Sequence, residues 1–255
     1  MKTELSSAAS EHNRYVIQAE WTVDLRSRIL GRINVDPDAR LLEVGSGTGA
    51  ITTSVAKELR SSGIFGVDIV HELSVFASGL SEGAYFSTAD GHKLPFVDGS
   101  FDVAFSHFLL LWVRDAERVL NEMKRVVRPG GWVIAFAEPD YGSRIDYPAE
   151  LEHIGRLQAE SLLRSGADPE IGRRLRALFA SVGLTSVVSG VLGGEWHTSL
   201  DDRLTRSEWD TLKSDLQGRI SEDELERLEN ADREAWKNQK RILFVPTFYA
   251  YGQVG

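Results

Sequence analysis

The sequence predicts an α/β fold, in which helices cover both faces of a doubly wound parallel sheet. Its first support is the alternation of predicted strands and helices over residues 40–138. The predicted strands are also near-continuous apolar runs, which is typical of strands with both faces covered. Because crossovers between parallel strands are right-handed, the possible topologies are limited to doubly wound forms.

The first predicted helix spans residues 11–33, because apolar side chains recur there with a period near 3.6. Seven further elements follow along the chain. In order, they are a strand, helix, strand, strand, strand, helix and strand over residues 41–44, 50–59, 64–67, 85–88, 101–105, 115–127 and 132–137. Asp115 can cap the second of these helices, and the Pro-Gly-Gly sequence at 129–131 ends it.

The pattern is looser after residue 138, where a polar and aromatic loop precedes two predicted helices, 149–165 and 168–182. Two more strands are predicted at 185–192 and 242–251. A charged helical insertion, 201–240, separates them, and its alternating charges favour a solvated helical face.

Composition excludes several classes of protein. The 255 residues include no cysteine, which rules out disulfides, thiolate metal sites and thiol nucleophiles, and the six histidines show no metal-ligand spacing. A net charge of −9 argues against nucleic-acid binding. The apolar run 103–113 is too short to span a membrane, and residues 1–11 lack a signal-peptide core. We therefore expect a cytoplasmic protein without metal, nucleic-acid or membrane partners.

A glycine-rich turn, Gly45-Ser-Gly-Thr-Gly49, joins the first strand to a helix. Asp68 ends the next strand, 23 residues after Gly45, where an acidic side chain can bind a ribose diol. The pattern formally fits a dinucleotide. However, Glu43 would face a pyrophosphate unfavourably, and Asp90 ends a third strand, where it can accept from an adenine amine. A ligand with an amine, a sulfonium, a ribose and an adenine would use all three carboxylates.

These segments resemble the motifs of class I S-adenosylmethionine (SAM)-dependent methyltransferases, most closely those of the ubiquinone-biosynthesis type. The matching segments are 42–49, 66–68, 89–96, 101–103 and 126–131. The resemblance covers about residues 40–138 and implies a Rossmann-like sheet of seven strands in the order 3-2-1-4-5-7-6, with the last strand antiparallel. It also implies one domain over 1–255, with an N-terminal helical lid (1–35), a SAM-binding core (36–140) and a substrate side (141–255).

The resemblance implies a set of cofactor-binding residues. Gly45 and Gly47 would lie under the methionine part, Glu43 near its amine and Asp68 on the ribose hydroxyls. Around the adenine and the methionine, it adds Ile69, Asp90, Gly91 and His107. The N-terminal helix of this family often closes over SAM, which adds Tyr15 and Trp21.

The carboxyl ends of the strands should also hold the methyl acceptor. His107 and Tyr141 are the candidate catalytic residues, His107 because an ordinary pKa near 6.5 suits a general base. Methyl transfer needs a base only if the acceptor arrives protonated. The candidate acceptor-binding residues are Trp112, Asp140, Tyr141, Arg144, Tyr147 and Trp196.

The sequence thus predicts methyl transfer from SAM to a nitrogen or oxygen of a small molecule, by a monomer or homodimer. Two alternatives stay open: a catalytically silent SAM- or nucleoside-binding module and an NAD(P)-dependent oxidoreductase. The sequence identifies neither the acceptor nor its pathway.

Overall fold

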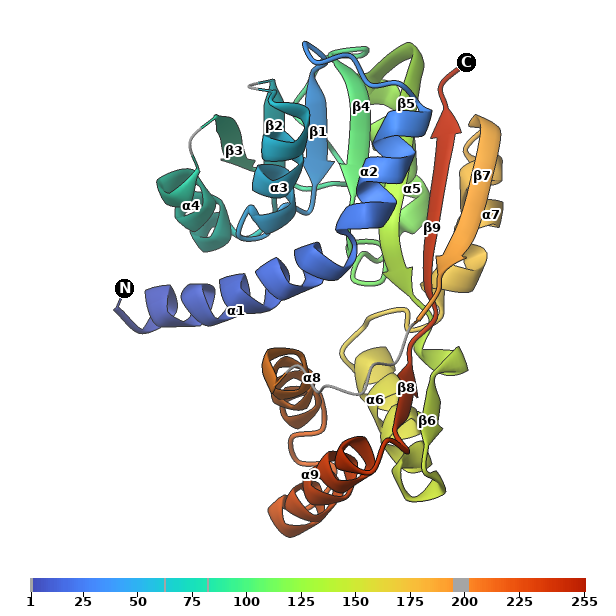
Figure 1. Cartoon of the computed structure of the whole chain (residues 1–255). Coiled ribbons are helices and arrows are strands. Elements are labelled where there is room, and N and C mark those ends of the chain that lie inside the picture. The colour runs from blue at the N-terminus through green and yellow to red at the C-terminus, as the bar shows by residue number, and fades with distance from the viewer. Residues whose placement is uncertain (1, 62, 82, 195–201) are drawn as a thin grey trace.

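The computed structural model describes residues 2–61, 63–81, 83–194 and 202–255. Its main sheet has seven strands in the order β3-β2-β1-β4-β5-β9-β7 (Figure 1). These strands are β1 (Leu41–Val44), β2 (Ile64–Asp68), β3 (Ala84–Thr88), β4 (Phe101–Ser106), β5 (Val127–Pro139), β7 (Thr185–Leu192) and β9 (Thr247–Gln253). The first five are mutually parallel, and β9 runs antiparallel to both β5 and β7. The predicted fold class and strand order are confirmed.

Helices pack on both faces of this sheet, as the apolar strands require. On one face, α2 (Val23–Arg32) and α3 (Ala50–Leu59) bury residues such as Leu30 and Val55 against the sheet. On the other face, α5 (Ala116–Val126) and α7 (Ile171–Ser181) bury Met123 and Phe179. Alternate residues of one strand therefore enter different cores, for example Ala104 and Phe105 of β4.

The predicted helix 11–33 was wrong in extent. The structure has two helices there, α1 (Lys2–Trp21) and α2, which meet at Thr22. The Thr22 hydroxyl donates to the Gln18 carbonyl oxygen at 3.0 Å, a local bond that competes with continuation of a straight helix. Figure 1 shows α1 projecting beside the sheet, whereas α2 lies against it.

Helix α4 (His71–Leu80) was not predicted from the sequence. Its buried residues are Ser74 and Ala77, so small side chains face the rest of the protein. Larger apolar residues such as Val75 are exposed. The helix therefore lacks the periodic stripe of large apolar residues on which the sequence analysis relied.

The last predicted strand, 242–251, is also divided. Its first part is β8 (Ile242–Phe244), and the chain passes Pro246 before β9 begins. Strand β8 pairs with β6 (Ile145–Tyr147) in a separate two-stranded sheet. Pro246 has no amide hydrogen to donate, which favours an interruption of strand pairing at this point.

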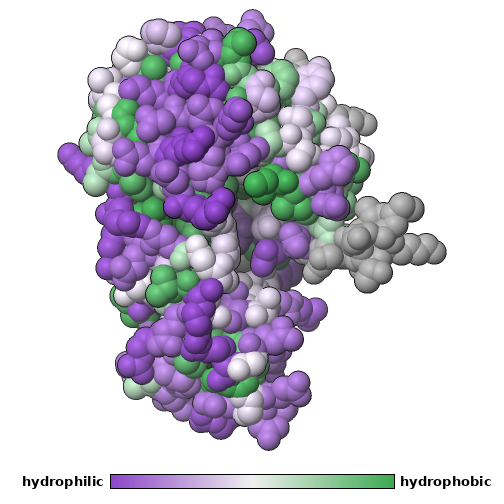
Figure 2. Space-filling view, turned by 180° about the vertical axis from the view of Figure 1, so that it is seen from behind, coloured by the Kyte–Doolittle hydropathy of each residue, from purple (hydrophilic) through white to green (hydrophobic). Residues whose placement is uncertain are grey.

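A smaller lobe, which we call the cap, comprises β6, β8, α6 (Glu152–Arg164), α8 (Asp202–Asp215) and α9 (Glu222–Lys237), with the short helix η2 (Ala149–Leu151). It lies below the sheet in Figure 1 and has its own core, which includes Ile154, Trp209 and Leu228. In the view of Figure 2, the surface is mostly hydrophilic with scattered hydrophobic areas. No helix in the described part of the chain has the length and apolarity to cross a membrane.

Buried ion pairs join the elements of the cap. Arg241 contacts the carboxylates of Asp146 and Asp232, each at 2.6 Å. Asp232 also accepts from the Trp209 indole at 3.0 Å. Removal of one partner from such a network leaves a buried charge without compensation.

We predict that Arg241→Met destabilises the cap by about 3–5 kcal/mol, because Asp146 and Asp232 both lose their ion pair with Arg241. Hydrogen exchange should accelerate in α9 and β6 while β1 stays protected. Arg227→Met is the matched control, since its pair with Glu224, at 3.8 Å, is exposed. Equal protection of α9 in the wild type and Arg241→Met would contradict the prediction.

Candidate functional site

The glycine turn lies between β1 and α3, at the carboxyl edge of the sheet. Gly45 and Gly47 have φ values of +78° and +50°, in the left-handed region that glycine adopts most readily. The amides of Gly45 and Ser46 both donate to the Val67 carbonyl oxygen, at 2.8 and 2.9 Å. The Gly47 amide donates to Asp68 Oδ2 at 2.8 Å. These bonds fix the turn against the end of β2.

Flexible side chains, rather than main chain, cover the turn. A Cβ atom on Gly45 would lie 2.6 Å from Leu109 Cδ1, and one on Gly47 would lie 3.1 Å from Tyr15 Cε2. Both glycines therefore offer backbone that a ligand can approach if Leu109 and Tyr15 change rotamer. This is a cradle of the kind that the methionine part of SAM requires.

The polar groups around the turn also fit SAM better than a phosphate ligand. Residues 43–52 contain no Lys or Arg. Asp68 is partly exposed at the end of β2, and the neighbouring Ile69 side chain is free to pack on a ring, with 68% of its surface exposed. Ser106 Oγ, at the end of β4, is buried without a hydrogen-bond partner in the described structure.

The adenine-side candidates are the exposed Asp90 and the neighbouring Gly91. Asp90 Oδ1 accepts from the His92 amide at 2.9 Å and lies 2.7 Å from His92 Nδ1. These bonds lower the Asp90 pKa, which keeps its carboxylate ionised. A Cβ on Gly91 would lie 3.0 Å from Val44 Cγ1, so this backbone is packed closely against β1.

Glu43, which the sequence analysis expected near the amine of the ligand, lies in β1. Its carboxylate is buried and accepts a hydrogen bond from the Thr52 hydroxyl on α3. Burial raises its pKa to about 8, in spite of the Thr52 bond and the nearby charge of Arg26. In this structure, Glu43 is bound to α3, and its expected role near the amine of SAM stays a prediction.

The position of His107 also differs from that of an exposed general base. It follows β4, is 7% exposed, and its Nε2 lies 3.1 Å from the Thr22 hydroxyl. Burial and the positive charge of Arg26 lower its pKa to about 3. Its imidazole is therefore neutral at neutral pH and only weakly basic.

Glu138, at the carboxyl end of β5, holds the loop that covers Gly45. One of its carboxylate oxygens accepts from the amides of Leu109 and Leu110, at 3.0 and 2.8 Å. The other accepts from the Leu111 amide at 3.2 Å, and burial raises the carboxyl pKa to about 8. The sequence places Glu138 at the end of this strand, among the candidates at the carboxyl edge, but it does not reveal these three hydrogen bonds.

Two acceptor-binding candidates are bound to other side chains. Asp140 is 1% exposed and bonds to both Nε and Nη2 of Arg173, at 2.5 and 2.6 Å. The buried Arg144 guanidinium contacts Asp146, Gln158 and Glu208, at 2.7, 2.6 and 3.1 Å. Both residues have a structural explanation without an acceptor.

The remaining candidates lie in different environments. Burial raises the pKa of Tyr141, and the charges of Glu208 and Asp215 add to that effect. Trp112 and Tyr147 are each 53% exposed. Trp196 lies outside the described residues.

Helix α1 brings one of its two predicted residues, Tyr15, to the turn, together with one that the sequence analysis missed. In addition to Tyr15, His12 contacts the turn, with its Nδ1 2.9 Å from Thr48 Oγ1. Trp21 is 46% exposed, and its ring lies 6.0 Å from that of Phe108, in the loop after β4. The periodic apolar residues of α1 predicted that one face of this helix is packed, but they did not indicate that this face contacts the glycine turn.

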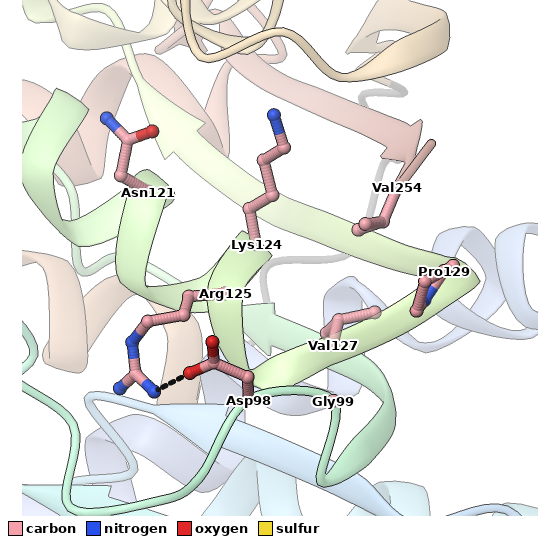
Figure 3. Close-up of a pocket in the computed structure, with 8 residues that line it drawn as sticks. All are labelled: Asp98, Gly99, Asn121, Lys124, Arg125, Val127, Pro129 and Val254. Atoms are coloured by element: carbon pink, nitrogen blue, oxygen red, sulfur yellow. Dashed lines mark hydrogen bonds and ion pairs between the residues drawn. The ribbon is translucent and has the colours of Figure 1, made fainter.

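A separate groove of about 510 Å³ lies at the opposite edge of the sheet (Figure 3). Its two cationic side chains are bonded to protein groups: Arg125 contacts Asp98 at 2.7 Å and Lys124 donates to the Val182 carbonyl oxygen at 2.7 Å. None of the predicted site residues lines it. Among the described residues, no group of three or more His, Cys, Asp or Glu could hold a metal ion.

We predict that His107 makes the free energy of unfolding depend on pH. Because its pKa is lowered on folding, its stabilising contribution is complete above about pH 6.5. That contribution is lost as the pH falls towards 3, by up to about 1.4 kcal/mol per pH unit. Urea unfolding of the wild type and His107→Gln at several pH values measures the difference between their free energies of unfolding. Glu43 and Glu138, whose pKa values are raised, contribute stability that is lost as the pH rises from about 4.5 to 8. The contribution of His107 is therefore isolated only by the difference between the wild type and the variant.

The exposed His71 supplies the control, as His71→Gln removes an imidazole from the surface. Parallel curves for the wild type and His107→Gln would show that burial does not suppress the protonation of His107.

Comparison with known proteins agrees with the site. Residues 42–135 match the family described as "Methyltransferase domain". An uncharacterised methyltransferase of Schizosaccharomyces pombe is 33% identical over 54% of this chain, which spans only 53% of that relative's length. Demethylmenaquinone methyltransferase of Bacillus velezensis is also 33% identical, over 64% of this chain and 78% of that protein.

The fold is shared with solved structures of much lower sequence identity. Phosphoethanolamine N-methyltransferase 2 of Haemonchus contortus, in complex with S-adenosyl-L-methionine, is 15% identical, with a TM-score of 0.61. That alignment covers 95% of this chain and 57% of the other. The strand order of the sheet, the glycine turn and the match to 78% of the Bacillus protein lead to one conclusion: the chain belongs to the class I SAM-dependent methyltransferases.

Proposed function

We propose that this chain transfers the methyl group of SAM to a nitrogen or oxygen of a small-molecule acceptor. The observation that carries the proposal is the bond between the Gly47 amide and Asp68, which joins an approachable turn to a carboxylate suited to a ribose. A small acceptor is supported by two related proteins, which are named for demethylmenaquinone and phosphoethanolamine. The first also supports, loosely, a relation to the quinone-biosynthesis enzymes. A cytoplasmic location stays a prediction.

In this proposal, the backbone of Gly45 and Gly47 lies against the methionine part of SAM. Asp68 accepts hydrogen bonds from the ribose hydroxyls, which a carboxylate with two oxygens can do while it keeps the Gly47 amide. Ile69 packs on the adenine, and Asp90 with the backbone of Gly91 lies at its edge. These assignments rest on the place of each residue at the carboxyl edge of the sheet and on the exposure of the Ile69 and Asp90 side chains.

SAM supplies a methyl group that its sulfonium has already activated. The protein then has to hold the acceptor in line and keep water away, and such positioning alone can contribute up to about 7–11 kcal/mol in ideal cases. Glu138 contributes by fixing the loop of Leu109–Leu111 through its three hydrogen bonds. Tyr15 and Leu109 cover the turn and exclude water from it.

We assign no proton abstraction to His107 or Tyr141. An imidazole with a pKa near 3 is a poor acceptor for the proton of an ammonium group or a hydroxyl. The raised pKa of Tyr141 keeps its phenol protonated, so it can donate a hydrogen bond to the acceptor. The acceptor therefore reacts as a neutral nucleophile, or as one that has lost its proton before it is bound.

The lid is part of the same proposal. Helix α1 contacts the turn through Tyr15 and reaches the cap through Glu20, which lies 3.7 Å from Arg203 of α8. A helix that bridges both lobes is placed to close over a bound cofactor, as expected for residues 1–35. The charged insertion 201–240 contributes α8 and α9 on the acceptor side.

We predict that Asp68→Asn weakens the binding of S-adenosylhomocysteine by about 10- to 100-fold, because a charge-assisted hydrogen bond is lost. Titration calorimetry measures this effect. Asp98→Asn is the control, since this exposed carboxylate lies in the groove at the opposite edge of the sheet. The wild type should not bind NADPH. Binding of NADPH without binding of S-adenosylhomocysteine would replace the proposal with an oxidoreductase.

Methyl transfer itself can be tested with labelled SAM and a library of small metabolites, followed through S-adenosylhomocysteine release. With an acceptor in hand, we expect His107→Gln and Tyr141→Phe to leave the pH dependence of kcat between pH 6 and 9 unchanged. Tyr141→Phe should raise KM for the acceptor by about tenfold, the effect of one lost hydrogen bond. A shifted pH profile in either variant would identify that residue as the base. Cofactor binding without turnover of any acceptor would support a silent binding module.

A further inference from the structure

Arg14 lies on α1, beside the part of the helix that covers the glycine turn. Its neighbour Tyr15 rests on Gly47, and the Arg14 guanidinium carbon is 5.1 Å from the centre of the Tyr15 ring. Arg14 Nη2 donates to the Tyr15 hydroxyl at 3.5 Å, at the limit of a hydrogen bond. The guanidinium is therefore adjacent to the space above Gly47.

The hydrogen-bonding needs of Arg14 are not met. Its Nε is buried and has no acceptor, and among the side chains that the structure describes, Arg14 forms no ion pair with a carboxylate. The nearby Glu11 carboxylate accepts instead from the Tyr15 hydroxyl, at 3.3 Å. By contrast, Arg144 and Arg241 are paired with carboxylates at 2.7 and 2.6 Å. A buried donor without an acceptor is costly, which favours an acceptor from a ligand.

The charge of Arg14 is also distinctive at this place. Residues 43–52 have no Lys or Arg, and burial lowers the pKa of His12, the other basic side chain of α1 in contact with the turn. Across from α1, Arg14 acts electrostatically on Tyr141 and Asp215, whose pKa values burial raises and the Arg14 charge lowers. Arg14 thus supplies positive charge to the region where the turn and the cap face each other.

We propose that Arg14 is a carboxylate-binding residue that holds the carboxylate of the amino-acid part of SAM. A guanidinium presents two parallel N–H donors, a geometry that matches the two oxygens of a carboxylate. Its position next to Tyr15, whose ring rests on Gly47, brings these donors beside the glycine turn, against which the methionine part of SAM is proposed to lie. This inference rests on the proposed function, because it presupposes that the turn binds SAM.

The test compares two ligands that differ only in this carboxylate. They are S-adenosylhomocysteine and 5′-deoxy-5′-(3-aminopropylthio)adenosine, which keeps the amine, ribose and adenine. Calorimetry should show that Arg14→Gln weakens the binding of S-adenosylhomocysteine by at least about tenfold and changes the affinity for the second ligand by less than about twofold. Arg14→Lys keeps the charge but lacks the two parallel N–H donors. Its affinity for S-adenosylhomocysteine should lie between those of the wild type and Arg14→Gln.

Arg28→Gln is the matched control, because it removes the same charge from α2, where Arg28 lies 6.0 Å from the Tyr249 ring. It should leave both affinities unchanged. If Arg14→Gln weakens both ligands equally or neither, the carboxylate assignment is overturned, since Arg14 then has only a structural or an acceptor-side role. If the wild type binds neither ligand, the proposed function itself fails. Circular dichroism of each variant confirms that the fold is intact.

Discussion

The hydrogen bond from the Gly47 amide to the Asp68 carboxylate joins the two strand ends on which the candidate site depends. It requires Gly47 to adopt a left-handed conformation, and it requires β2 to end level with the turn. Parallel pairing of β1 and β2, with Val44 opposite Val67, places the ends of the two strands side by side. The same bond orients the carboxylate, because a fixed donor on one oxygen limits rotation of the side chain. The site is therefore organised by the sheet before any ligand binds.

Glu138 plays the corresponding role on the other side of the turn. Its carboxylate accepts from three consecutive amides and thereby sets the path of the loop after β4. That loop places Leu109 over Gly45, while α1 places Tyr15 over Gly47. One cover is held rigidly through a buried carboxylate, whereas the other belongs to a helix that also reaches the cap. Ligand entry is thus more easily explained by movement of α1 than by movement of the loop.

The sequence patterns predicted a doubly wound parallel sheet, and the resemblance to the methyltransferase family implied its strand order, but neither revealed side chains whose partners lie on other elements. Gly45, Asp68 and Asp90 lie at strand ends, where local motifs determine their position. Glu43, His107 and Asp140 are buried and lie within hydrogen-bond distance of Thr52, Thr22 and Arg173, which are 9, 85 and 33 residues away. No local pattern reveals such contacts. Helix α4 and the pair β6–β8 escaped prediction for a related reason, because small buried residues and three-residue strands give weak periodicity.

The distribution of charge explains why proton transfer has little place in this site. Burial disfavours the charged forms of the ionisable groups near the turn. His107 is neutral at neutral pH, and burial raises the pKa values of Glu43 and Glu138 to about 8. The pairs of Arg144 and Arg241 neutralise charge within the cap. Two charged groups therefore lie next to the turn on its ligand side: the cation Arg14, beside the Tyr15 ring that covers Gly47, and the carboxylate of Asp68, which binds the Gly47 amide, while Arg26 is buried behind it. Such a site favours a ligand with a carboxylate at one end and hydroxyl groups at the other, and its selectivity for SAM then depends on charge placement rather than on acid–base chemistry.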